Sequence, residues 1–415
     1  MTHDPQPTAA PVIPLDDILE ALDLSSAQPG IGFLEALFAR FNARVPFESA
    51  SKILRDADVP EASEKPRTPE IFWADHLELG TGGTCFARVA AFDALLSALG
   101  FRSRRLLGRV EHDHDHAALM VETPAGESLV DVGFPLPALL PAHTGHVETA
   151  LGGLRVDSTP RGISVAFADG VPEGPRALEI FSAPVSEERF REIWKQTFRP
   201  GARFLSKVVM RRDLGNRVVS YAAGQVRVDD LHSRLRVPSP LMRAAALPEL
   251  FGIDPKVLSR AFEIVGQDVA PSPEASLTAY LEVAAPPDEA LSAIATPAGY
   301  RRLVGGVADV LSEEPTSSGF RLTLGAPGRE REARAETVDA VRPDLAARRV
   351  WLERSMGASV SRSSYGVEVR PGKTYLIREA VLPSSGEDLL RNDSLRGRWA
   401  GSLALDLLAW ARMLS

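Results

Sequence analysis

The sequence predicts an α+β protein built from two domains. Its 415 residues exceed what one hydrophobic core usually supports, so we expect at least two domains. Apolar residues recur at helical spacing up to about residue 100, and short alternating runs separated by Gly, Pro and Asp follow from 104 to 169. The pattern restarts after a stretch that contains Pro and Ser. We predict a disordered leader at residues 1–13, a first domain at 14–266, a linker at 267–275 and a second domain at 276–415.

The composition excludes several classes of partner. Hydrophobic residues make up 44% of the chain and charged residues 25%, which is typical of an ordinary globular protein. The formal net charge is -8 and the Arg residues are spread along the chain, so we expect no nucleic-acid partner. No apolar stretch approaches the length of a membrane span, and the first residues do not resemble a signal peptide. We therefore predict a cytoplasmic protein with no membrane partner; the oligomeric state stays open.

The chain has a single cysteine, Cys85, and cannot form an internal disulfide. Cys85 begins a long amphipathic pattern that ends before Gly100, so we expect it in or just before the first turn of a helix. Free backbone amides and the helix dipole at that position favour a thiolate over a thiol. Gly82 and Gly83 allow the backbone to approach closely. The setting favours a nucleophile, with a buried structural thiol as the alternative.

A cysteine nucleophile needs a base within reach and a group that holds this base in the right tautomer. His116 opens an apolar strand in EHDHDHAALMVE, and Asp131 ends a strand in SLVDVGFP. A turn at residues 124–126 joins these strands into a hairpin, which can place both side chains together. A helix that carries Cys85 against such a hairpin is typical of papain-like thiol enzymes. We predict Cys85 as nucleophile, His116 as general base and then acid, and Asp131 as the residue that orients it.

The histidine-rich run leaves alternatives open. His114 lies two residues from His116 on the same strand face and could be the base, and His116 could merely bond a carbonyl group. Asp131 could instead cap the loop that follows its strand. His112, His114 and His116 alternate as metal ligands could, but the intervening aspartates would point away and no further ligand is evident. We predict no metal.

These motifs resemble those of the arylamine N-acetyltransferases. That family shows Gly-Gly-x-Cys-Phe/Tyr, a His at the head of an apolar strand, and Asp-Val-Gly-Phe, in the order found here as GGTCF, His116 and DVGF. Its Ile-Pro-Phe-Glu-Asn segment is similar to residues 45–49, VPFES, and its later hairpin and helix pair are similar to RPGARFLSKVVM and LPELFGID. The resemblance covers residues 14–265 and transfers the roles of Cys, His and Asp onto Cys85, His116 and Asp131.

The resemblance implies a papain-like fold with a helical subdomain, an antiparallel β-barrel and an α/β lid. It implies transfer of an acetyl or other acyl group from coenzyme A, through a Cys85 thioester, to an arylamine, hydrazine or related amine. Acetyl-CoA or another acyl-CoA would be the co-substrate, and Phe47, Gly133 and Phe134 would bind substrate; on general grounds both Phe residues could be core. An amide synthase that takes its thioester from an acyl carrier protein is a close variant.

Four positions depart from the family pattern. Thr81 stands where the family has Arg, and Ala87 and Val89 stand where it has Glu and Asn, so polar groups that support the site are missing. Pro135 replaces the usual Gly after DVGF, in the loop that meets the acyl donor. The changes at 87, 89 and 135 keep a transglutaminase-like thiol hydrolase as an alternative.

The second domain has no sharp motif. LTAYLEVAAPPDEALSAI predicts a strand, a Pro break and a helix, and residues 394–414 predict a long amphipathic helix. This order resembles the helix-grip α+β fold of the START and polyketide-cyclase-like (SRPBCC) domains. The resemblance implies a hydrophobic ligand pocket, and the alternative is an interior filled by the domain's own side chains. A further alternative is therefore a non-catalytic protein that binds a hydrophobic ligand.

Overall fold

The computed structural model describes residues 12–167, 177–242, 244–270, 272–304, 309–325, 337–356, 359–370, 373–382 and 386–414. The chain divides into two units. The first consists of Met1–Val226 and Arg243–Pro271, and the second of Arg227–Met242 and Ser272–Ser415. Residues 1–11 of the expected disordered leader lie outside the described residues.

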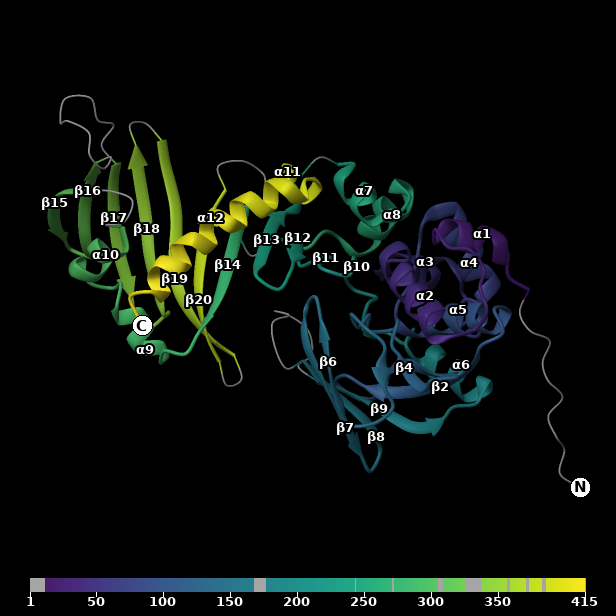
Figure 1. The fold of residues 1–415 in the computed structure, drawn as a ribbon. Coiled ribbons are helices and arrows are strands. Elements are labelled where there is room, and N and C mark those ends of the chain that lie inside the picture. The colour runs from purple at the N-terminus through teal and green to yellow at the C-terminus, as the bar shows by residue number, and fades with distance from the viewer. Residues whose placement is uncertain are drawn as a thin grey trace, which may run out of the picture. The chain divides into compact units, whose positions relative to one another are not determined.

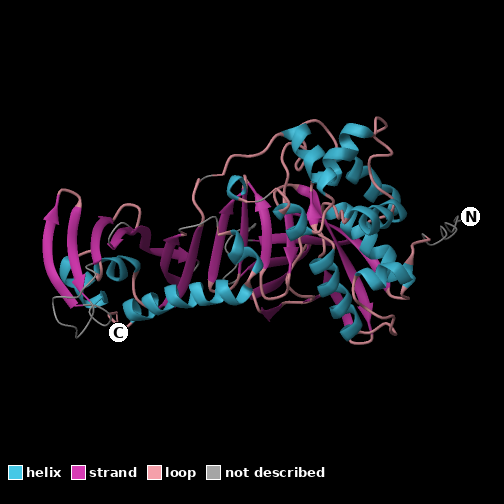
Figure 2. Cartoon of the chain, turned by 90° about the horizontal axis from the view of Figure 1, so that it is seen from above, coloured by secondary structure: helices cyan, strands magenta, loops and turns pink. Residues whose placement is uncertain are grey.

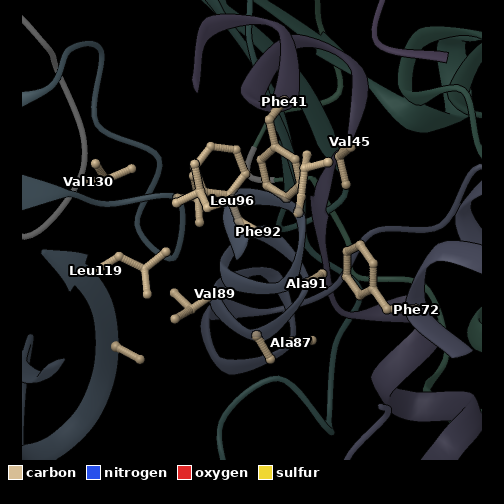
Figure 3. Packing of buried hydrophobic residues seen from close by; sticks show 14 of the residues in the cluster. Phe41, Val45, Phe72, Ala87, Val89, Ala91, Phe92, Leu96, Leu119 and Val130 are labelled. Carbon is tan, nitrogen blue, oxygen red and sulfur yellow. The ribbon is translucent and has the colours of Figure 1, made fainter. Parts of the chain in front are cut away.

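A helical layer opens the first unit. Its helices are α1 (Leu15–Ala21), α2 (Ile31–Arg44), α3 (Ala50–Asp58), α4 (Pro69–Leu79) and α5 (Cys85–Ala98). Helix α5 is the centre of this layer, because it is buried around almost its whole circumference. Figure 3 shows Phe41, Val45 and Phe72 on one side of α5, and Leu119 and Val130 on another. Apolar side chains thus enclose the helix that begins at Cys85.

An eight-stranded antiparallel sheet follows the helices. Its strands, in the order in which they pair, are β5 (Leu140–Pro141), β4 (Gly126–Val130), β3 (Asp113–Thr123), β2 (Arg102–Arg109), β9 (Ala177–Pro184), β8 (Gly162–Phe167), β7 (Gly152–Thr159) and β6 (Gly145–Thr149). Leu140 of β5 and Val147 of β6 pack onto the same apolar cluster, although their strands are first and last in this order. The sheet therefore curls around one core, as a barrel subdomain requires.

The rest of the first unit combines a few strands and helices. Strand β1 (Phe47–Glu48) pairs with β10 (Met210–Asp213), which pairs with β11 (Val218–Ala222); β12 (Gln225–Asp229) leads the chain into the second unit. The helices are α6 (Glu187–Gln196), α7 (Ala246–Phe251) and α8 (Pro255–Val265). Ala223 and Gly224 both have positive φ, 49° and 72°, so a turn separates β11 from β12.

The second unit is an antiparallel sheet with helices. Its strands pair in the order β13 (Ser233–Pro238), β14 (Ser276–Val283), β20 (Lys373–Val381), β19 (Ser359–Arg370), β18 (Arg349–Met356), β17 (Thr337–Asp344), β16 (Gly319–Gly325) and β15 (Asp309–Thr316). Its helices are the 3-10 turn Ser239–Leu241, α9 (Pro287–Ser292), α10 (Pro297–Val304), α11 (Glu387–Arg391) and α12 (Asp393–Ala411). Helix α12 packs against β14 and β20 and crosses the strands obliquely in Figure 1; Figure 2 shows it as one long helix beside the sheet.

The α+β class is confirmed, since helices and antiparallel sheets occur in both units. None of the helices in the described ranges is long and apolar enough to cross a membrane.

His76, near the end of α4, is a buried side chain whose protonation affects stability. Its ring is buried, and Nδ1–H donates to the Thr81 carbonyl at 2.9 Å, just before the glycine pair. Burial lowers the pKa of His76 from 6.5 to about 4, because it outweighs the hydrogen bond to Thr81, and nearby Arg side chains lower this pKa further. The unfolded chain therefore binds a proton at a pH where the folded chain does not. This group's contribution to stability is complete above pH 6.5 and is lost as the pH falls toward 4.

We expect His76 to reduce the free energy of unfolding by about 2 kcal/mol between pH 6.5 and about pH 5, at about 1.36 kcal/mol per pKa unit. His76→Asn keeps an N–H donor but does not titrate, so this variant should lose that part of the pH dependence. Urea unfolding at both pH values measures it. His146→Asn, at an exposed histidine, is the control and should retain the dependence. An unchanged pH dependence in His76→Asn would contradict this account.

Candidate active site

Cys85 is the first residue of α5. The preceding residue, Thr84, has an extended backbone, so the chain turns directly into the helix at the cysteine. Close packing of the preceding loop requires glycine, since a Cβ on Gly82 would lie 1.8 Å from the Pro46 carbonyl oxygen. The Cys85 side chain is 8% exposed, and Sγ lies 3.8 Å from the Asp115 carbonyl oxygen. The thiol therefore sits at the amino end of a buried helix, where the helix dipole favours negative charge.

His116 and Asp131 form a buried pair beside this helix. His116 lies within β3, and Asp131 directly follows β4, which pairs with β3 in a hairpin. The two atoms His116 Nε2 and Asp131 Oδ2 are 2.7 Å apart, and both side chains are almost completely buried. Asp131 Oδ1 accepts a hydrogen bond from the Phe134 amide at 2.7 Å. Asp131 thus holds the ring and also caps its own loop.

Gly133 brings the thiol and the imidazole together. A Cβ on Gly133 would lie 2.9 Å from Cys85 Cβ and 3.0 Å from His116 Cε1. The cysteine and the histidine therefore flank the same backbone atom, and their side chains interact. Because Asp131 occupies Nε2, Nδ1 is the nitrogen of His116 that remains for the sulfur. Any larger residue at 133 would push the two side chains apart.

The charges of this group favour a protonated imidazole. Burial alone would lower the pKa of His116, but the Asp131 carboxylate and its hydrogen bond, together with Cys85, raise this pKa above its ordinary value. An imidazolium is thus stable between a carboxylate and a sulfur that can carry a negative charge. The arrangement can hold a thiolate–imidazolium pair.

The neighbouring histidines lie outside this group. His112 and His114 are exposed, and His114 has a positive φ of 65° and stands edge-on to Phe181. The backbone irregularity at this end of β3 explains why His114 does not share the strand face of His116. Within the described part of the chain, no three His, Cys, Asp or Glu residues are placed to hold a metal ion together.

The two predicted substrate-binding aromatics lie near the site but in different layers. Phe47 is in β1, and its ring lies 5.5 Å from that of Phe204. Phe134 follows Gly133, and the Arg211 guanidinium lies 5.6 Å from its ring centroid. Both rings are partly exposed.

A buried arginine that the sequence analysis missed supports the site. Arg88 lies one turn after Cys85 in α5 and is 0% exposed. Its Nε donates to the Val132 carbonyl at 2.7 Å and its Nη2 to Asn42 Oδ1 at 2.7 Å, while Nη1 donates to the Val45 carbonyl. One guanidinium thus joins the helix of Cys85 to the end of α2 and to the segment between Asp131 and Gly133. An unbroken apolar helix pattern that contains one arginine is the signal that could have revealed it.

A second buried arginine supports the glycine loop. Arg67 donates through Nη2 to the Gly82 carbonyl and, at 3.1 Å, to Ser51 Oγ, and through Nη1 to Asp75 at 3.0 Å. It also lies 3.5 Å from Thr81 Oγ1, the position at which the sequence departs from the family's Arg. A guanidinium therefore reaches this loop from outside the motif.

Residues 31–149 match a family described as N-acetyltransferase. Over 118 residues the chain is 30% identical to the arylamine N-acetyltransferase of Mycolicibacterium smegmatis. The resemblance to the arylamine N-acetyltransferases is confirmed. The aligned part is 26% of this chain and 41% of that relative, so the chain spans about two fifths of the relative's length.

Solved structures share the fold over a longer stretch. The M. smegmatis arylamine N-acetyltransferase, 21% identical, superposes with a TM-score of 0.52 over 61% of this chain and 99% of that chain. The Mycobacterium marinum arylamine N-acetyltransferase, solved in complex with CoA and 22% identical, gives 0.51 over 60% of this chain and 99% of that chain. This likeness shows the fold that carries the site.

We expect Arg88→Met to lower the free energy of unfolding by about 3 kcal/mol, because it leaves buried carbonyl groups without donors. Chemical denaturation measures the loss. Arg104→Met removes a partly exposed guanidinium paired with Glu127, and should cost less than about 1 kcal/mol. Equal losses in the two variants would show that Arg88 is no more important than a surface arginine.

Proposed function

We propose that this protein is an acyltransferase that carries an acyl group on Cys85. The observation that supports this most is the buried His116–Asp131 pair beside a cysteine at a helix N-terminus. A nucleophile, a base and a residue that orients the base lie together, which is what thiol acyl transfer needs. The confirmed family resemblance supports the same reaction.

The chemistry follows from the charges of these groups. The Cys85 thiolate attacks the carbonyl carbon of a thioester, a new C–S bond forms, and the leaving thiolate takes a proton from His116. An amine then attacks the Cys85 thioester and gives a proton to His116 as the C–N bond forms and sulfur leaves. Asp131 keeps Nδ1 of the ring directed at the sulfur in both steps.

Acetyl-CoA or another acyl-CoA is the proposed donor, and an arylamine, hydrazine or related amine the proposed acceptor. The CoA complex of the M. marinum relative supports the donor class. The proposed substrate site is lined by Phe47, Gly133 and Phe134. Phe47 pairs with Gly83, two residues before Cys85, and Gly133 packs against Cys85 itself. A carrier-protein thioester in place of acyl-CoA would make the protein an amide synthase. Water in place of the amine would make it a hydrolase.

For the second unit we propose a helix-grip domain at residues 276–415. The antiparallel sheet with α12 along β14 and β20 supports this proposal. The ring of Tyr365 lies 5.8 Å from that of Trp410 and 6.4 Å from that of Tyr300. These buried aromatic rings favour an interior filled by the domain's own side chains over a large apolar ligand pocket.

Incubation with acetyl-CoA should raise the intact mass by one acetyl group and release one equivalent of CoA thiol in a burst. Cys85→Ala should show neither, because this residue is the sole cysteine. Intact mass spectrometry with a panel of acyl-CoA donors measures the reaction. If no thioester of the panel acylates Cys85, the proposed function is wrong, and a non-catalytic binding role takes its place.

Asp131→Asn should slow acylation by roughly 10³-fold or more, because a neutral amide lacks the charge that stabilises an imidazolium and can donate to the ring nitrogen in the wrong tautomer. The rate of thiol release in the burst measures this effect. Asp157→Asn, at a half-exposed aspartate paired with Arg155, is the control and should leave the rate unchanged. Asp131→Asn acylating at the unaltered rate would remove Asp131 from the mechanism.

A further inference from the structure

Lys52 is a buried cation beside the nucleophile that the mechanism above does not use. It lies in α3 and is 6% exposed. A narrow pocket that it lines is also lined by Gly83, Thr84 and Ala87, which lie within two residues of Cys85 along the chain. The ammonium group and the sulfur are close enough to interact electrostatically.

The ammonium group of Lys52 is held but not neutralised. Its Nζ donates to the Arg203 carbonyl at 2.9 Å and lies 5.3 Å from the centroid of the Phe198 ring. In the described ranges no carboxylate lies within ion-pair distance of it. Burial lowers the pKa of Lys52 to about 8, while Cys85 and Asp56 act in the opposite direction. Near neutral pH the group is therefore still cationic and has two further N–H donors.

The same pocket gathers further positive charge. Arg55, Lys65 and Arg67 line it together with Lys52. Lys65 and Arg67 each pair with an aspartate, at 2.6 and 3.0 Å, whereas Arg55 donates to backbone carbonyl groups. Burial and the charge of Arg67 lower the pKa of Arg55, as expected for crowded cations. Four basic side chains thus line the pocket, and the two aspartates paired with them neutralise only part of that positive charge.

The reaction changes the charge that faces Lys52. In the proposed reaction Cys85 is a thiolate before acylation, and the thioester that replaces it is neutral. A buried cation is costly unless a negative charge lies near it. The substrate itself can supply that charge. The free volume of the pocket is about 10 Å³, which accommodates one water-sized group. A carboxylate oxygen is of this size.

We propose that Lys52 forms an anion-recognising subsite beside Cys85, and that the acyl group handled by this enzyme bears a carboxylate. The proposal rests on the proposed acyl transfer, and it makes Lys52 a residue that determines specificity. Arg55 adds to the positive field of the subsite without being required for contact.

Two alkylating reagents of the same shape test the subsite directly. Iodoacetate is anionic and iodoacetamide is neutral, and both report on Cys85 alone because the chain has one cysteine. At neutral pH we expect the ratio of the iodoacetate rate to the iodoacetamide rate to be about tenfold higher in the intact protein than in glutathione. Lys52→Met should bring that ratio within about twofold of glutathione, and Lys52→Arg should keep most of the preference.

Lys195→Met is the control, because Lys195 is paired with Glu192 at 2.6 Å and does not line the pocket. Its ratio should equal that of the unaltered protein. A ratio equal to that of glutathione in the unaltered protein, or a preference that survives in folded Lys52→Met, would overturn the proposal. If Lys52→Met does not fold, Lys52→Gln serves as the second neutral variant.

A substrate pair then separates this proposal from the proposed function. Succinyl-CoA should acylate Cys85 about tenfold faster than butyryl-CoA, which has the same chain length without the carboxylate. Equal rates, or a faster butyryl-CoA, would contradict the subsite while leaving acyl transfer intact. If neither donor acylates Cys85, acyl transfer fails, and the alkylation ratio still decides whether the anion subsite exists.

Discussion

The hydrogen bond between His116 and Asp131 is the interaction on which the rest of the site depends. Both side chains are almost completely buried, and a buried carboxylate is costly unless a donor or a cation meets it. The imidazole meets it at 2.7 Å, and the Phe134 amide meets its other oxygen. The pair in turn requires β3 and β4 to pair in register beside the amino end of α5. The position of Cys85 follows from this packing.

Close backbone packing keeps these elements together. Gly82 lies against Pro46, and Gly133 lies against Cys85 and His116, at distances that leave no room for a Cβ. Arg88 then joins three segments with one guanidinium, so the segment after Asp131 cannot move away from α5 without breaking buried hydrogen bonds. Ala87 stands where the family has a polar Glu, and the neighbouring Arg88 supplies buried hydrogen bonds from the same helix. A site assembled from distant segments is held by a few such contacts.

Local signals in the sequence account for most of the fold, and long-range contacts account for what was missed. Helical periodicity begins at Cys85, and alternation marks the strands of His116 and Asp131, because each pattern depends on neighbours in the chain. The role of Arg88 depends on carbonyl groups more than forty residues away, which no local pattern reports. The Lys52 subsite is hidden for the same reason, since a lysine in an amphipathic helix usually faces solvent.

We expect Asp131 and Cys85 to keep His116 protonated inside the protein. Nitrogen-15 NMR of the histidine side chains at neutral pH tests it most directly, with His116 assigned through a His116→Gln variant. We expect both ring nitrogens of His116 to carry protons in the unaltered protein, and the pKa of the ring to fall when Cys85→Ala removes the sulfur. A neutral ring with one protonated nitrogen in the unaltered protein would contradict the thiolate–imidazolium pair.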